Sequence, residues 1–322
     1  MKALVTGGTG FIGSHVVDEL LENGYDVRIL TRRKEYSSEK KVEVMRGDIT
    51  FEKSIDACLK DIDIVFHVAA LSSEWEKRKK FMEINVKGTR NVVNACIRNG
   101  IKKIVYMSTA GVYGFPNVEY PIKENEKIRM HNAYSFSKFM GEKIVLGCRD
   151  IYGVAVRSPL VIGPRDKNVV PVLIERIKKG KMMYIRNKEN VISLSHPRDV
   201  ATCLRLAGEK GKEGNVYNVK SFDCSIRELF EAFAKYLGIN VPYKTIPYPV
   251  AYLSALFLEG IYMAMRRKKA PPLTRYKVCL LGTKRIISVE KAEKELNFKA
   301  RYNMEETVKE SVEWYAKIKN YG

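Results

Sequence analysis

A tyrosine and a lysine four residues apart offer the clearest chemistry in this sequence. Tyr134 and Lys138 stand in the run Tyr-Ser-Phe-Ser-Lys, and a spacing of four places both side chains on one face of a predicted helix. A free phenol has a pKa near 10, so bringing it close to 7 takes about 4 kcal/mol. A neighbouring ammonium group acts in that direction. The pair is therefore a candidate acid–base couple that exchanges a proton with a substrate oxygen.

A glycine-rich turn near the start of the chain predicts a binding site for the phosphates of a ligand that would act together with this pair. A short apolar strand at 2–5 is followed by Thr-Gly-Gly-Thr-Gly-Phe-Ile-Gly and then by a helix at 13–23. In a strand–turn–helix context such glycines allow a tight turn and a close approach of the backbone to a pyrophosphate. Free N–H groups at the helix start attract the phosphates. The predicted cradle consists of Gly7, Gly10, Phe11, Ile12 and Gly13.

The end of the second predicted strand distinguishes between the two nicotinamide cofactors. That end reads Leu-Thr-Arg-Arg and carries no carboxylate to bind a ribose 2′-hydroxyl. Arg32 and Arg33 can instead bind a 2′-phosphate, so NADP is favoured over NAD, with a solvated basic loop as the alternative. Asp48 and Ile49 follow the third strand and are candidates for the adenine. Asp48 can equally cap the next helix.

A hydroxyl pair follows the fifth predicted strand, at 104–107. Ser108 or Thr109 can orient and polarise the reacting oxygen, because the carboxyl ends of parallel strands face the ligand in open α/β sheets. A plain turn is the other interpretation.

The elements that position these residues alternate between strand and helix. Such alternation predicts right-handed βαβ units and an α/β fold with a Rossmann doubly wound parallel sheet. We expect residues 1–165 to form this dinucleotide-binding part, with 190–220 returning to it. Residues 166–189 and 221–322 are predicted to form a smaller, mostly helical substrate lobe. The predicted strands are 2–5, 27–30, 42–44, 62–68, 104–107, 154–157, 191–194 and 216–219, and the helices 13–23, 54–59, 80–99, 134–149, 169–179 and 199–207.

Composition narrows the choice of partners. The chain has 322 residues and a formal net charge of +20, from 57 basic and 37 acidic residues, which raises the chance of anionic partners. The basic residues are spread along the chain without a nucleic-acid-binding motif, so we expect a solvated surface and no nucleic acid. Six scattered cysteines and four histidines show no metal-ligand spacing. Free thiols and the lack of a signal-like N-terminus predict a cytoplasmic protein without a metal.

An apolar run at 250–265, followed by four basic residues at 266–269, allows three interpretations. It is too short and too polar to span a bilayer. A lid over an apolar substrate pocket is the first interpretation. A helix lying on a membrane surface, which would make the protein membrane-peripheral, is the second. Core packing is the third.

Taken together, these motifs resemble the extended short-chain dehydrogenase/reductase family, also called the NAD-dependent epimerase/dehydratase superfamily. The resemblance covers nearly the whole chain. Besides the cradle and the Tyr-x-x-x-Lys pair it includes Gly47-Asp48, His67-Val68-Ala69-Ala70, Asn85-Val86-Lys87-Gly88-Thr89, Ser108-Thr109 with Val112-Tyr113-Gly114, Gly163-Pro164 and His196-x-x-Asp199-Val200-Ala201.

The resemblance implies roles for further residues. Thr109 lies four residues before Tyr113, as in the family pattern, and would therefore be the catalytic hydroxyl. Lys138 would also bind the nicotinamide ribose. Cofactor contacts are implied for Ala69, Ala70 and Pro159. The family also often forms homodimers through helices that build a four-helix bundle.

The family includes nucleotide-sugar epimerases and dehydratases as well as reductases. Many sugar-nucleotide members carry an asparagine after strand six, where this chain has Leu160. An apolar residue at this position makes the chain more similar to the dihydroflavonol-reductase and 3β-hydroxysteroid-dehydrogenase-like branches. The resemblance then implies that Ser108 and Leu160 face the substrate. We therefore expect an NAD(P)-dependent oxidoreductase acting on a secondary alcohol or ketone, one with a bulky apolar body. A nucleotide-sugar 4-epimerase or dehydratase with retained cofactor is the alternative, and a non-catalytic dinucleotide-binding or membrane-scaffold protein is the second alternative.

Overall fold

A parallel sheet forms the centre of the molecule. The computed structural model describes residues 1–33, 41–240 and 244–320, and within them seven parallel strands follow the order β10-β6-β5-β4-β1-β2-β3. The order reverses between β1 and β4, as in a doubly wound fold, which confirms the predicted fold class. The strands are β1 (Lys2–Thr6), β2 (Asp26–Thr31), β3 (Glu43–Arg46), β4 (Ile64–His67), β5 (Lys103–Thr109), β6 (Tyr152–Ser158) and β10 (Val216–Asn218).

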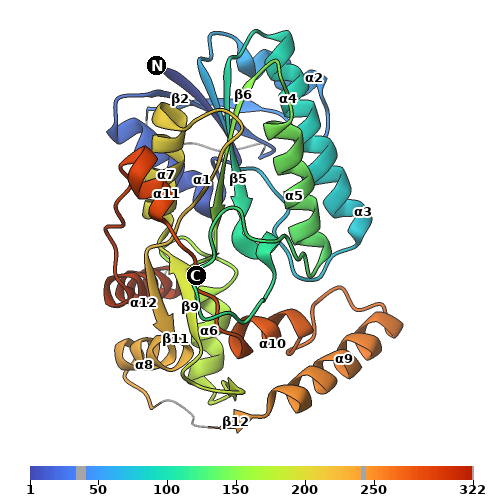
Figure 1. Cartoon of the computed structure of the whole chain (residues 1–322), viewed down its shortest axis with the longest axis vertical. Helices are drawn as coiled ribbons and strands as arrows, with labels where there is room; N and C mark the ends of the chain where they lie inside the picture. The colour runs from blue at the N-terminus through green and yellow to red at the C-terminus, as the bar shows by residue number, and fades with distance from the viewer. Residues whose placement is uncertain (34–40, 241–243, 321–322) are drawn as a thin grey trace.

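Helices cover both faces of this sheet (Figure 1). On one face α1 (Phe11–Glu22) and α7 (Pro197–Lys210) pack together, and their apolar residues share a core with Val5 of β1. On the other face α4 (Gly88–Arg98) and α5 (Ala133–Leu146) share a core with Leu4 of the same strand. Successive strand residues point to opposite faces, so burial on both sides explains why these strands read as continuous apolar runs.

The long helix predicted at 80–99 is divided into three segments. A short helix α3 (Arg78–Phe81) leads into a π-helical turn (Met82–Lys87), which continues as α4. Such turns are rare and often occur at functional sites. This one contains Asn85, whose side chain acts in the site described below.

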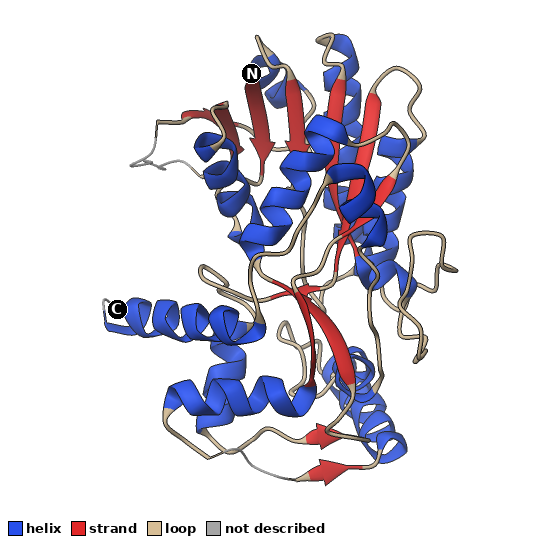
Figure 2. Ribbon diagram, turned by 60° about the vertical axis from the view of Figure 1, so that its left-hand side comes forward, coloured by secondary structure: helices blue, strands red, loops and turns tan. Residues whose placement is uncertain are grey.

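Two smaller sheets build the lower part of the molecule (Figure 2). One has the order β11-β9-β7, and the other pairs β12 with β8. The predicted strand at 191–194 is thus part of a separate small sheet, and the chain returns to the central sheet only with α7 and β10. The strands are β7 (Leu160–Val161), β8 (Tyr184–Ile185), β9 (Val191–Ser195), β11 (Phe222–Ser225) and β12 (Thr245–Ile246).

The remaining helices lie mostly around these small sheets, as predicted for a helical lobe. One difference concerns α11, because Ala292, Leu296 and the following Phe298 are buried in the core shared with α1 and α7. The C-terminal third of the chain therefore contributes to both parts. The helices are α6 (Val170–Lys178), α8 (Ile226–Leu237), α9 (Tyr248–Ala264), α10 (Arg275–Gly282), α11 (Glu290–Leu296) and α12 (Met304–Asn320). None of the helices in the described ranges has the length and apolar character needed to cross a bilayer.

Candidate active site

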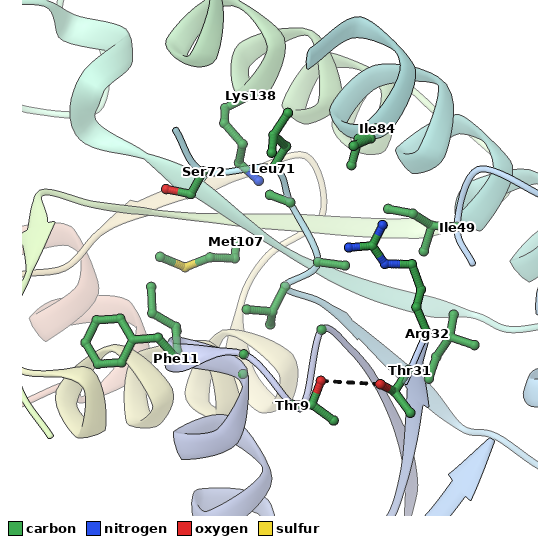
Figure 3. A pocket seen from close by; sticks show the side chains of 18 of the residues that line it. Thr9, Phe11, Thr31, Arg32, Ile49, Leu71, Ser72, Ile84, Met107 and Lys138 are labelled. Atoms are coloured by element: carbon green, nitrogen blue, oxygen red, sulfur yellow. Dashed lines mark hydrogen bonds between the residues drawn. The ribbon is translucent and has the colours of Figure 1, made fainter. Parts of the chain in front are cut away.

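A cavity of about 490 Å³ opens at the carboxyl ends of the central strands. Ser72 and Lys138 lie at one end and Thr31 and Arg32 at the other (Figure 3). This is the edge of a doubly wound sheet where ligands bind. The lining consists of Gly7, Thr9, Gly10, Phe11, Ile12, Gly13, Leu30, Thr31, Arg32, Gly47, Asp48, Ile49, Val68, Ala69, Ala70, Leu71, Ser72, Ile84, Met107, Ser108, Tyr134, Lys138 and Asn168.

The glycine turn has the geometry of a phosphate cradle. Gly7 has a φ of +74°, and a Cβ there would lie 2.8 Å from the backbone of Ala69. A Cβ on Gly13 would lie 2.0 Å from the Gly7 carbonyl oxygen. Gly10 precedes the first turn of α1, and no side chain caps that helix start. The uncapped N–H groups of this turn are therefore available to an anion.

A buried polar chain fixes the strands that carry the cradle. The Thr6 hydroxyl lies 2.6 Å from Nδ1 of His67, and Nε2 of the same ring lies 2.9 Å from the Thr89 hydroxyl. Burial, and secondarily the charge of Lys138, lowers the pKa of His67 to about 3. The ring is thus neutral at physiological pH and offers one donor and one acceptor to the two threonines. Thr6 also accepts a hydrogen bond from the Ala69 amide at 3.2 Å, which places that residue on the cavity wall.

Asn85 holds the loop that follows β4. Its Oδ1 accepts from the Leu71 amide at 2.7 Å, and its Nδ2 donates to the Leu71 carbonyl at 3.1 Å and to the Ser137 hydroxyl at 2.9 Å. One side chain thereby joins the loop to α5. Ser72, next along the loop, lies on the cavity wall with Tyr134 and lowers the pKa of its phenol. The sequence pattern included Asn85 as a family motif but gave no sign of these partners, which lie far away in the chain.

Tyr134 and Lys138 lie on the wall of this cavity, on adjacent turns of α5. The helix starts at a capping box in which Asn132 and Ser135 satisfy each other's backbone groups, so the first turn is fixed. The Lys138 ammonium is 4.1 Å from the centre of the Tyr106 ring. Burial lowers the pKa of Lys138 to about 7, against the opposing effect of Glu142.

The pKa of Tyr134 differs from the sequence-based expectation. Burial raises it to about 12, the Tyr276 hydroxyl adds to the rise, and the polar Ser72 side chain opposes it. Desolvation therefore dominates in the protein alone, and the lysine, itself desolvated, does not lower the phenol pKa as expected. The phenol is in its protonated, proton-donating form at neutral pH.

The two candidate hydroxyls after β5 have different surroundings. Ser108 lines the cavity, yet its hydroxyl donates at 2.6 Å to Glu142, which forms a buried ion pair with Arg157 at 2.5 Å. This hydroxyl is therefore already engaged, contrary to its predicted role toward the substrate. The Thr109 hydroxyl accepts from the Gly111 amide at 3.0 Å, which leaves its own proton available. Of the two hydroxyl groups, that of Thr109 is the one whose proton can be donated to a ligand.

The other residues predicted for the site divide into those that line the cavity and those that do not. Asp48 and Ile49 line the cavity near Arg32, whose guanidinium is 3.9 Å from the Asp48 carboxylate. Asp48 also caps its own turn by accepting from Thr50. The residues predicted for the site that are not among those lining the cavity are Arg33, Pro159, Leu160 and Thr109. Leu160 packs against the core of the lower part, so its apolar character serves packing there.

Other lining residues were not predicted. Leu71, Ser72, Ile84 and Met107 are apolar or small, and Asn168 comes from the loop before α6. None stands in a pattern with a chemical meaning of its own. No cluster of metal-ligating side chains occurs in the described part of the chain.

A second cavity of about 430 Å³ lies beside the start of α5. Asn132 and Ala133, just before Tyr134, belong to its wall, and α9 and α10 close the opposite side. The wall is rich in aromatic side chains. It consists of Glu74, Trp75, Phe115, His131, Asn132, Ala133, Tyr252, Glu259, Met263, Thr274, Arg275, Tyr276 and Cys279.

A glycine cradle and a Tyr–Lys pair on one cavity are the features on which the sequence resemblance rests, and a comparison with known families agrees. The sequence model of the NAD dependent epimerase/dehydratase family matches residues 3–219, more than half of the chain. The chain belongs to this family. Membership confirms the predicted dependence on a nicotinamide dinucleotide and the predicted oxidoreductase class.

Several family members are similar over most of their length. The sterol-4-alpha-carboxylate 3-dehydrogenase (decarboxylating) of Mus musculus is 29% identical, covering 97% of this chain and 90% of the mouse protein. The 2-alkyl-3-oxoalkanoate reductase of Stenotrophomonas maltophilia is also 29% identical, with 95% and 97% covered. A putative UDP-glucose 4-epimerase of Methanocaldococcus jannaschii is 33% identical over 74% of this chain and 83% of its own. The crystal structure of gox2253 superposes with a TM-score of 0.84 at 28% identity, covering 98% of each chain.

Proposed function

We propose that this protein transfers a hydride between a nicotinamide dinucleotide and a secondary alcohol or ketone that has a bulky apolar body. The observation that carries the proposal is the shared cavity: the cradle of Gly7 to Gly13 lies at one part of its wall, and Tyr134 and Lys138 at another. The bound cofactor supplies the hydride acceptor or donor.

The chain's own residues handle the proton. Tyr134 exchanges it with the substrate oxygen, and Ser72, on the same cavity wall, acts on the pKa of the phenol. Thr109 has a free hydroxyl proton to polarise the same oxygen. With a pKa near 7, Lys138 gains or loses its proton at little cost, and its place on the wall suits the ribose contact that the family resemblance implies.

Replacing Tyr134 by phenylalanine tests this proposal. The ring remains and the proton donor is lost, so we expect turnover to fall by at least about 100-fold, the lower bound of general acid–base catalysis. Cofactor affinity, measured by fluorescence titration of the reduced dinucleotide, should stay within about twofold, because the cradle is unchanged. Near-normal turnover in this variant would remove Tyr134 from the mechanism.

The second cavity supports a bulky apolar substrate. It begins at the residues before Tyr134, and Tyr276 on its wall is close enough to affect the Tyr134 pKa. Trp75, Phe115 and Met263 give it an apolar surface, as small-molecule sites commonly have. The mouse and bacterial relatives are named for a sterol carboxylate and for an alkyl-substituted alkanoate, both of which have a large apolar body.

A carboxylate bonded to the carbon next to the reacting carbon is the finer part of this proposal. In both of those names the carboxylate is on the carbon beside carbon 3, which is oxidised or reduced. Arg285 is a buried cation, 3% exposed, with no carboxylate among the described residues as its ion-pair partner. Its guanidinium lies 5.0 Å from the Phe115 ring, which lines the second cavity. Its Nη1 donates to the Gly114 carbonyl at 3.4 Å, and its Nε has no hydrogen-bond partner among the described residues. A buried cation of this kind suits an anionic group on the substrate.

A pair of substrates tests the carboxylate. The probes are a 2-alkyl-3-hydroxyalkanoate and its methyl ester, with formation of the reduced cofactor as the readout. A charge-assisted hydrogen bond should favour the acid by at least about tenfold in kcat/KM. Arg285→Met should remove that preference and leave the ester rate within about threefold. Equal rates for acid and ester in the unmodified protein would refute the role of Arg285 without affecting that of Tyr134.

The alternative reaction is epimerisation or dehydration of a nucleotide sugar, with the hydride returned to the substrate. The family's description and the archaeal relative favour it as the second candidate. An enzyme of that kind retains its cofactor, so dinucleotide in a one-to-one ratio in the purified protein, with no net consumption during turnover of UDP-glucose, would support it. Release of cofactor and net oxidation or reduction would support the first proposal.

A further inference from the structure

The outer face of α9 carries large apolar side chains along most of its length, with Ser254 as an exposed polar side chain among them. Seven large apolar side chains on this helix and the residue after it are exposed. Val250, Leu253, Phe257 and Ile261 follow one another at spacings of three and four, which places them in one stripe. In Figure 1 the helix runs along the lower edge of the molecule. We call the seven residues the α9 apolar face: Val250, Leu253, Leu256, Phe257, Ile261, Met263 and Met265.

The charge distribution in α9 is the reverse of that in a helix facing water. The charged residue within Tyr248–Ala264 is Glu259, and it points inward, 7% exposed. Its carboxylate accepts from Nε of Arg275 at 2.7 Å and from the Arg275 amide at 2.8 Å. The inner face also buries Ala251 and Ala255. A helix between protein and water carries its charges outside, so the outer face of α9 suits an apolar environment.

A run of four cations directly follows this helix. Arg266, Arg267, Lys268 and Lys269 are all exposed. Trp75 donates from Nε1 to the Arg267 carbonyl at 3.1 Å and so ties this end of the helix to the body of the protein. The apolar face and the cations therefore lie together on a fixed part of the surface. The net charge of +20 opposes docking of a second copy and favours an anionic partner.

We propose that the α9 apolar face and residues 266–269 dock on the surface of a bilayer that contains anionic lipid. The helix has 17 residues and would lie in the plane of the membrane interface, with its apolar side chains among the acyl chains and the cations at the headgroups. Apolar burial and charge act together here, as stable peripheral binding requires.

The same helix borders the second cavity. Tyr252 lines it from the inner face, and Met263 both lines it and belongs to the exposed apolar face. The rim of the cavity thus reaches the surface proposed to contact lipid. A consequence, which rests on the proposed function, is that an apolar substrate enters the cavity directly from the bilayer.

Vesicle flotation without substrate or cofactor tests the docking itself. The purified full chain is mixed with vesicles of phosphatidylcholine alone or with added phosphatidylserine. We expect strong binding to the anionic vesicles, weaker binding to the neutral ones, and loss of binding at high salt. Val250→Asn/Phe257→Asn should lower the partition coefficient at least about tenfold. Lys268→Gln/Lys269→Gln should lower it by roughly 30-fold on anionic vesicles, at about fivefold per cation.

A matched control comes from the rest of the surface. Phe51 is 70% exposed, like Phe257, and Val172 is 52% exposed, against 53% for Val250. Phe51→Asn/Val172→Asn should bind vesicles like the unmodified protein. Equal binding by both asparagine double variants, or no binding of the unmodified chain to anionic vesicles, would overturn the proposal. It would also be overturned if the unmodified chain dimerised in sedimentation velocity, bound no vesicles and became monomeric in Val250→Asn/Phe257→Asn. Tyr134→Phe should bind vesicles normally, which separates this test from that of the reaction.

Discussion

Replacing Lys138 by methionine should stabilise the protein alone while abolishing its activity. Lys138 is 2% exposed, and burial lowers its pKa from 10.5 to about 7. The folded state therefore binds this proton more weakly than the unfolded state does. The free energy of unfolding is reduced at every pH at which Lys138 is charged in the unfolded chain. This lost stability returns as the pH rises from about 7 toward 10.5. Methionine has a similar shape and no charge to desolvate.

The size of the effect follows from that pKa. At about 1.4 kcal/mol per tenfold, the ammonium costs roughly 4 kcal/mol at pH 7 and roughly 1.5 kcal/mol at pH 9.5. The free energy of unfolding of Lys138→Met should exceed that of the unmodified protein by these amounts, less any loss of packing. Urea unfolding at the two pH values measures the difference.

A lysine on the same helix provides the control. Lys143 is exposed, and Lys143→Met removes the same formal charge without removing a buried ammonium. Its stability should change by less than about 0.5 kcal/mol at either pH. The reasoning is refuted if Lys138→Met is no more stable than Lys143→Met at pH 7, or if its gain is the same at pH 9.5.

Three further predictions concern the cofactor and the core. Arg32→Ala should raise the Kd for NADPH by at least about tenfold and leave the Kd for NADH nearly unchanged. Arg33 is not on the cavity wall, so Arg33→Ala should change neither Kd. Equal effects of Arg32→Ala on both cofactors would exclude a 2′-phosphate contact. Gly13→Ala should weaken binding of either cofactor by over about tenfold in the same titrations, because its Cβ would lie 2.0 Å from the Gly7 oxygen and displace the cradle. Glu142→Gln should lower the free energy of unfolding by about 3 kcal/mol or more, since Arg157 would remain as a buried, unpaired charge, and a change below about 1 kcal/mol in urea unfolding would contradict this.

The sequence predicted those features whose residues lie close together in the chain. The cradle, the Tyr–Lys pair and the alternating strands each depend on residue types within a few positions, where glycine geometry and helix periodicity act directly. Tyr134 and Lys138 could be placed on one helix face for the same reason. The predicted boundaries of the central strands also lie within a few residues of those observed.

Features that depend on distant partners could not be predicted. Ser108 is engaged by Glu142, 34 positions away, and the bonds of Asn85 reach Ser137, 52 positions away. Strands of two residues, such as β8, are too short for alternation to indicate them. The raised pKa of Tyr134 depends on how deeply the cavity is enclosed, which no spacing reports.

The position of Phe298 has a consequence for how this molecule evolves and can be divided. Leu296 and Phe298, which are fully buried, complete the apolar layer beneath α1 and α7, although the family region ends at residue 219. A fragment ending there would leave that layer open to water, so we expect the region matched by the family model not to fold as a separate module. Recombination that exchanges the C-terminal third for another substrate specificity must conserve this short returning segment, or rebuild the layer on which it rests.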